Sequence, residues 1–186
     1  MLISTAIDLG EFVEELKQET DRGLPLVAAA LIDDKLAETL RSFFCNVPAA
    51  GKLLDDTNAA LGTFSSRAEA CYALGLIDEF EYREIALIRK IRNEFAHAKH
   101  GTSFQNARVQ GLCSTLQTEA VEVAGYSASD PRFRFMSAAV AIVLRLYHRP
   151  DWVKQERRQP KPWPNLNPPE SCYCGEPRLV VTPLKS

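Results

Sequence analysis

The stretch Asp78–Ala98, which reads DEFEYREIALIRKIRNEFAHA, determines the expected fold class. At 100° per residue, Ile88, Ile91 and Phe95 fall on one arc about 100° wide, which is the pattern of an amphipathic helix that faces a core. The aspartate that opens the stretch is a good N-cap residue, and acidic residues precede basic ones, an order that complements the helix dipole. We therefore expect one long helix with a buried apolar side.

Most of the chain on both sides of this stretch has the same helical period. No window alternates with period two, and no internal repeat is present, so we predict an all-α, compact multi-helix bundle. Lys52–Gly62 is ambiguous between a helical turn and a loop. Apart from that segment, the remaining helices are expected at 9–16, 24–45, 65–74, 103–116 and 131–148.

Proline and charge divide the chain into two parts. Of the 11 prolines among 186 residues, eight lie between Pro150 and Pro183. Residues 149–186 carry seven Lys or Arg against four Asp or Glu, a net charge of +3, so the remainder has fifteen against twenty, or −5. We expect a helical domain at 1–149 and a proline-rich, irregular C-terminal arm at 150–186.

Composition argues against several classes of function. An acidic body is a poor surface for wrapping DNA. The longest apolar run, 136–144, is much shorter than the roughly 20 residues of a membrane span, and no secretory leader is visible, so we expect no membrane partner. The cysteines lie mostly singly, and Cys172 and Cys174 lack a second pair, so we expect a reducing cytoplasmic setting, no metal and no cofactor.

Arg92, Asn93 and His97 lie outside the apolar arc and admit two interpretations. In the structural one, Arg92 satisfies a buried carboxylate and His97 ends the helix. In the catalytic one, Arg92 stabilises negative charge while His97 moves the proton of a ribose 2′-hydroxyl, as metal-free RNA cleavage requires. The two side chains are about 140° apart on the helix, so a shared site would need a two-fold dimer.

Three stretches in order resemble the mannitol operon repressor family of bacterial regulators. They are ALIDDKL at 30–36, LGTFSSR at 61–67 with ALGLI at 73–77, and the segment Ile88–His97. The similarity spans roughly residues 10–150. It implies a compact helical domain that acts as a transcriptional regulator in the repression of sugar-alcohol operons.

The string from Arg92 to His97 also resembles the Arg-x4-6-His motif of HEPN domains. These are small helical domains, often dimeric, and some are ribonucleases. The resemblance implies a homodimer and, as an alternative function, a metal-independent endoribonuclease that acts on RNA through Arg92 and His97.

A repressor suggests a helix-turn-helix, and the pair around Gly75 is the only candidate. Its second helix opens with Asp78, Glu79, Glu81 and Glu84. The first residues of a recognition helix enter the major groove, where carboxylates would be repelled by phosphates. We therefore expect contact with a protein partner in place of direct DNA reading.

Two further clusters are candidate sites. The arm interleaves aromatic and basic residues, either as a contact for a partner or single-stranded nucleic acid or, as we favour, with its tryptophans anchoring the arm to the body. Those residues are Trp152, Arg157, Arg158, Lys161 and Trp163. The other cluster is a predicted structural polar network, because a buried charge needs a partner. Its members are Asp33, Asp34, Ser65 or Ser66, Arg67 and Arg92.

Overall fold

The computed structural model describes residues 6–98, 101–119 and 127–163. Every regular element in these ranges is a helix, which confirms the all-α prediction. In chain order the helices are α1 (Ala6–Gln18), α2 (Gly23–Phe43), α3 (Pro48–Asp55), α4 (Phe64–Ala73), α5 (Glu79–His97), α6 (Ala107–Ser114), α7 (Pro131–Tyr147), α8 (Arg149–Val153) and the 3₁₀ turn η1 (Lys154–Glu156).

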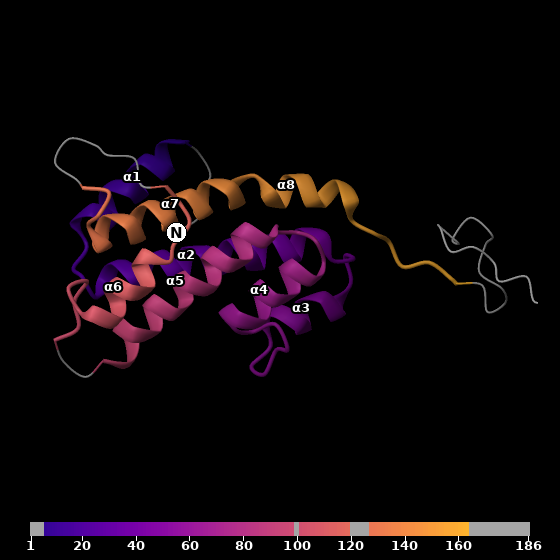
Figure 1. Ribbon diagram of the computed structural model, residues 1–186. Helices are drawn as coiled ribbons and strands as arrows, with labels where there is room; N and C mark the ends of the chain where they lie inside the picture. The colour runs from indigo at the N-terminus through magenta and orange to yellow at the C-terminus, as the bar shows by residue number, and fades with distance from the viewer. Residues whose placement is uncertain (1–5, 99–100, 120–126, 164–186) are drawn as a thin grey trace, which may run out of the picture.

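The central element of the bundle is α2, which packs against α4, α5, α7 and α8 (Figure 1). Its apolar side chains join those of α5 and α7 in one core. The largest side chains with less than 2% exposure include Phe95, Phe104 and Phe135, which form a chain of tilted ring contacts. The helix expected from the stretch at 78–98 is α5, and Ile88, Ile91 and Phe95 are fully buried, as its period predicts.

Local sequence signals set where α4 and α5 begin and end. Thr63 and Ser66 form a capping box at the start of α4, and Asp78 and Glu81 form another at the start of α5. Such reciprocal bonds satisfy N–H groups that lack a partner within the helix. Gly75 ends α4 with φ +70°, a left-handed conformation that glycine adopts at little cost.

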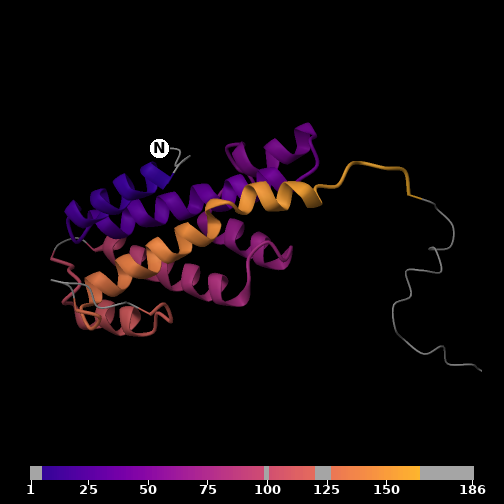
Figure 2. The same cartoon turned by 90° about the horizontal axis from the view of Figure 1, so that it is seen from above.

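Helical structure continues past Pro150 into the expected arm. Figure 2 shows α8 following α7 after a bend. Val153 is buried, and Arg157 donates to the carbonyls of Ser42 at 2.6 Å and Arg41 at 3.0 Å, which completes the C-terminal end of α2. Residues 158–163 are irregular and lead away from the bundle (Figures 1 and 2).

The two tryptophans do not anchor the arm, contrary to our expectation. Trp152 is 71% exposed and Trp163 is 68% exposed. The anchors are Val153 and Arg157, because a small apolar side chain and two charge-assisted hydrogen bonds fix this segment to α2. Within the described ranges no helix is long and apolar enough to cross a membrane.

Candidate protein-binding site

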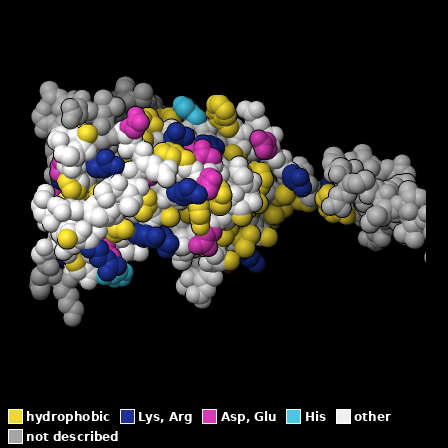
Figure 3. All heavy atoms as spheres, viewed as in Figure 1, with side chains coloured by type: hydrophobic (Ala, Val, Ile, Leu, Met, Phe, Trp, Pro, Cys, Tyr) yellow, Lys and Arg dark blue, Asp and Glu magenta, His cyan; other side chains and the backbone are white. Residues whose placement is uncertain are grey.

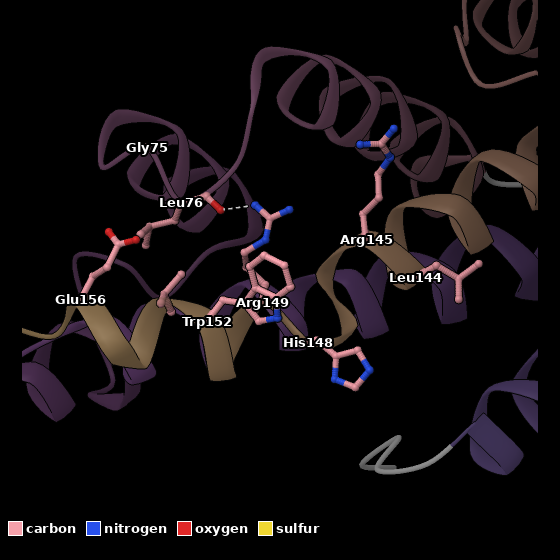
Figure 4. Close-up of a pocket in the computed structure, with 9 residues that line it drawn as sticks. Gly75, Leu76, Leu144, Arg145, His148, Arg149, Trp152 and Glu156 are labelled. Atoms are coloured by element: carbon pink, nitrogen blue, oxygen red, sulfur yellow. Dashed lines mark hydrogen bonds between the residues drawn. The ribbon is translucent and has the colours of Figure 1, made fainter.

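A hollow of about 450 Å³ lies where the turn between α4 and α5 meets the end of α7 and the start of α8 (Figure 4). Its lining comes from the turn between α4 and α5 and from the segment that contains α7, α8 and η1. They are Gly75, Leu76, Leu144, Arg145, His148, Arg149, Trp152, Val153 and Glu156. The hollow is therefore a junction between elements that are distant in sequence.

A buried ion pair holds this junction together. Glu81 is fully buried, and its Oε1 accepts from Arg149 Nη2 at 2.7 Å while its Oε2 accepts from Arg149 Nη1 at 3.2 Å. Arg149 also donates to the Leu76 carbonyl, the bond drawn in Figure 4. Because Glu81 accepts from the Asp78 N–H as well, at 2.9 Å, one carboxylate connects the start of α8 to the cap of α5.

Exposed apolar side chains line the hollow at Leu144 (50% exposed) and Trp152 (71%), and we call these two residues the Trp152 face. Tyr72 (41%) and Leu74 (44%), at the C-terminal end of α4, are also exposed. Figure 3 shows hydrophobic side chains gathered toward the end of the body from which the arm departs. Large apolar side chains with this much exposure, grouped beside a hollow, are typical of a surface that binds another protein.

Ring and charge contacts hold several side chains in place around the start of α5. Tyr72 stacks on Tyr82, with ring centroids 4.4 Å apart and planes 6° apart. Arg145 places its guanidinium 4.7 Å from the centroid of the Phe80 ring and 3.8 Å from Asp78 Oδ2. In Figure 4, Arg149 points toward Leu76, whereas His148 points away from it. Side chains held in this way lose little conformational freedom when a partner binds.

The structure joins two members of the predicted polar network directly. Arg67 Nη1 lies 2.9 Å from Asp33 Oδ2, and Arg67 also donates to the carbonyls of Leu61 at 2.9 Å and Leu54 at 3.4 Å. Burial raises the pKa of Asp33, and the hydrogen bond from Arg67 opposes that rise. Arg67 thus ties α2 to α4 and to the loop between α3 and α4.

The other members of that network lie in different surroundings. Arg92 donates to Asn93 Oδ1 at 3.0 Å, and its charge acts on Asp33 without forming an ion pair. Asp34 is exposed, and Ser65 donates to Glu69 at 2.9 Å. Ser66 serves the capping box of α4.

Arg92 and His97 do not meet within this chain. Arg92 is half-buried and engaged with Asn93, whereas His97 is exposed at the end of α5. Neither lines the hollow beside Trp152. In the part of the chain that the structure describes, no group of three or more His, Cys, Asp or Glu side chains is arranged to hold a metal ion.

The structural roles of Glu81 and Glu84 were not predicted from the sequence, in which they counted only as carboxylates at the start of a possible recognition helix. Both are fully buried. Glu84 accepts from the backbone N–H groups of Gln117 at 2.7 Å and Thr118 at 3.3 Å and from the Thr118 hydroxyl at 2.7 Å. The start of α5 is therefore unsuited to the major groove mainly because Arg149 of α8 and the segment after α6 bind its buried carboxylates. Its acidic charge is a secondary reason.

Comparisons with known proteins support the fold. No protein-family profile and no curated protein matches the chain. Among solved structures, the X-ray structure of the MtlR-HPr complex from Escherichia coli is similar, with a TM-score of 0.53 and 23% sequence identity over 78% of this chain and 98% of that chain. The bundle described above is thus an MtlR-like fold, as the resemblance to the mannitol operon repressor family implied.

Proposed function

We propose that this protein is a regulator that works as a protein-interaction module and binds a small protein of the HPr kind through the Trp152 face. The observation that carries the proposal is the 71% exposure of Trp152 beside a hollow whose walls are fixed by a buried ion pair. Exposure of a large aromatic side chain to water is unfavourable. A tryptophan on a rigid surface contributes strongly to the binding free energy when a partner buries it.

The composition of the Trp152 face supports a protein ligand over a small molecule or nucleic acid. Tryptophan and arginine contribute strongly to binding energies at protein interfaces, and Trp152 and Arg145 both line this hollow. The hollow next to them is open, so a side chain from a partner can enter it. Glu156 lines it and Asp78 lies 3.8 Å from Arg145, so carboxylates offset the cations that a phosphate would meet there.

The choice of partner rests on the structural neighbour. That protein was crystallised with HPr, and the similarity extends over 98% of the matched chain. The resemblance to the mannitol operon repressor family adds the regulatory role, with repression exerted through the protein partner. We also propose a cytoplasmic setting, consistent with the free cysteines Cys45, Cys71 and Cys113.

Calorimetric titration of the full chain with HPr from the same organism tests the proposal. Truncating a hot-spot side chain costs about 2 kcal/mol or more, so Trp152→Ala should weaken binding roughly 30-fold. Trp163→Ala is the matched control, because Trp163 is 68% exposed but lies on the arm, away from the hollow. Wild-type binding that Trp152→Ala leaves intact would refute the surface, and absence of any HPr binding would refute the partner.

We also propose a homodimer, which the resemblance to HEPN domains implied. Size-exclusion chromatography with light scattering of the full chain tests it, and a mass of one chain at micromolar concentration would refute it. We do not extend the proposal to ribonuclease activity, since Arg92 is engaged with Asn93 and His97 lies elsewhere on the helix.

A further inference from the structure

The two arginines that line the hollow beside Trp152 already have partners within the chain. Arg149 donates to the Glu81 carboxylate and to the Leu76 carbonyl. Arg145 Nη1 lies 3.8 Å from a carboxylate oxygen of the residue that caps α5 and 4.0 Å from Glu81 Oε1. The positive charge of these arginines is therefore largely neutralised before any partner arrives.

Glu156 supplies the one carboxylate of the lining, and its situation is different. Its side chain is exposed, and no hydrogen bond or ion pair joins its carboxylate to a residue in the ranges that the structure describes. His148, the remaining basic residue of the lining, has its Nδ1 3.9 Å from Asp151 Oδ2. Among the lining residues, Glu156 thus carries the charge that is not compensated.

Trp152 lies four residues before Glu156 on the helical segment formed by α8 and η1, and both side chains line the hollow (Figure 4). Residues four apart on a helical surface are neighbours. The Trp152 side chain is 71% exposed, and no ring or cation contact joins it to any residue that the structure describes. An exposed indole ring and an uncompensated carboxylate therefore lie next to each other.

These two side chains match two parts of a three-part arrangement found elsewhere in the chain. The Arg145 guanidinium lies 4.7 Å from the centroid of the Phe80 ring and 3.8 Å from Asp78 Oδ2, so one cation meets both an aromatic face and a carboxylate. Aromatic faces attract cations, and the face of tryptophan attracts them most strongly. Trp152 and Glu156 supply the ring and the carboxylate, and the cation is the missing part.

We propose that the partner docks on the Trp152 face through a protruding arginine or lysine. The aliphatic stem of that side chain packs on the Trp152 ring, and its charged end reaches the Glu156 carboxylate. Leu144, which is 50% exposed, offers an apolar contact for the residues around it. The inference rests on the proposed function for the use of this face, and it adds the chemistry that selects the partner, which is a basic side chain on an apolar surface.

A nuclear magnetic resonance titration of the ¹⁵N-labelled full chain tests the cation contact without HPr. The chain has two tryptophans, so two indole N–H signals are expected, and Trp163, whose ring already carries Lys161 at 4.5 Å, is the internal reference. N-acetyl-arginine amide at millimolar concentrations should shift the Trp152 signal saturably. N-acetyl-norleucine amide, whose side chain is uncharged, should bind about tenfold more weakly.

Two matched variants identify the carboxylate in the same titration. Glu156→Gln keeps the shape of the side chain but removes its charge, and it should abolish the preference for the arginine derivative. Asp151→Asn removes a charge from the same helical segment, at a side chain that is 82% exposed and does not line the hollow, and it should leave the preference unchanged.

Calorimetric titration of these variants with HPr tests whether the protein partner uses the contact. Glu156→Gln should weaken HPr binding about tenfold, because a charge-assisted hydrogen bond is lost, and Asp151→Asn should have no effect. Raising sodium chloride from about 0.05 to about 0.5 M should weaken wild-type binding more than binding to Glu156→Gln, since salt screens the contact between Glu156 and the cation.

Equal binding of the arginine and norleucine derivatives, or tighter binding of N-acetyl-glutamate amide, would overturn the inference. So would binding of HPr that depends on Trp152 but is unchanged in Glu156→Gln. Failure of HPr to bind the wild-type chain would instead refute the proposed partner, and the arginine titration would then decide by itself whether Trp152 and Glu156 form a cation site.

Discussion

The ion pair between Glu81 and Arg149 makes the strongest prediction about stability. Arg149→Met keeps the side chain long but removes its charge. The Glu81 carboxylate, which is fully buried, then keeps the hydrogen bond from the Asp78 N–H and the guanidinium of Arg145 at 4.0 Å. Removing one partner of a buried pair costs about 3–5 kcal/mol. Arg149 is 26% exposed and Arg145 offers partial compensation, so we expect a loss of about 3 kcal/mol in the free energy of unfolding.

Urea unfolding followed by far-ultraviolet circular dichroism measures this loss, and in a chain of this size it should lower the melting temperature by about 6–12 °C. Arg83→Met is the matched control. Arg83 pairs with Glu79 on the same helix, but the two side chains are 58% and 61% exposed, and such a pair contributes about 0.5 kcal/mol or less.

A double substitution separates the contribution of the two charges to stability from the contribution of side-chain packing at the junction. Arg149→Met combined with Glu81→Met removes both charges and should recover part of the stability lost in Arg149→Met alone, because no buried carboxylate is left without its cation. A loss of stability in Arg149→Met no greater than that in Arg83→Met would refute this prediction, as would a double variant that is less stable than Arg149→Met alone.

Three further predictions concern other parts of the molecule. Arg67→Met should cost about 2 kcal/mol, more than Arg92→Met, because Arg67 alone forms the ion pair with Asp33; equal losses in urea unfolding would contradict this. Burial raises the pKa of Cys71 and of Cys113 to about 12, whereas thiols in the unfolded chain ionise near 9. Only the unfolded chain therefore loses these protons between pH 9 and 12, so the free energy of unfolding should fall over that range, and it should fall less steeply when both cysteines are replaced by Ala. Purified protein should leave RNA intact in EDTA; cleavage that His97→Ala abolishes would establish the ribonuclease alternative.

The helices of this fold could be predicted because their signals are local. The apolar period of 78–98, the glycine at 75 and the capping aspartates at 78 and 130 each act within a few residues, and the structure places α4, α5 and α7 accordingly. The departure at Pro150 has a simple cause. Proline is tolerated in the first turn of a helix, so Pro150 fits into the first turn of α8, where an irregular segment was expected.

The tertiary partners of charged residues could not be predicted, because nothing in their neighbourhood of the sequence identifies them. The capping-box spacing Asp78-x-x-Glu81 signals a local role for Glu81, but Arg149 lies 68 residues away from it. Glu84 binds backbone groups 33 and 34 residues further on, and Arg157 binds carbonyls at the end of α2. Such groups are recognised only when the fold has brought them together.

The position of Glu81 bears both on DNA reading through α5 and on the proposed binding of a protein. A helix pair around Gly75 could read DNA only if the start of α5 were free to enter a groove. Here Glu81 is committed to Arg149, and this contact brings α8, with Trp152, over the turn between α4 and α5. Freeing the start of α5 would therefore dismantle the hollow and displace the exposed tryptophan. The proposed binding of a protein through the Trp152 face and the reading of DNA through α5 therefore exclude each other, and the burial of Glu81 argues for the former.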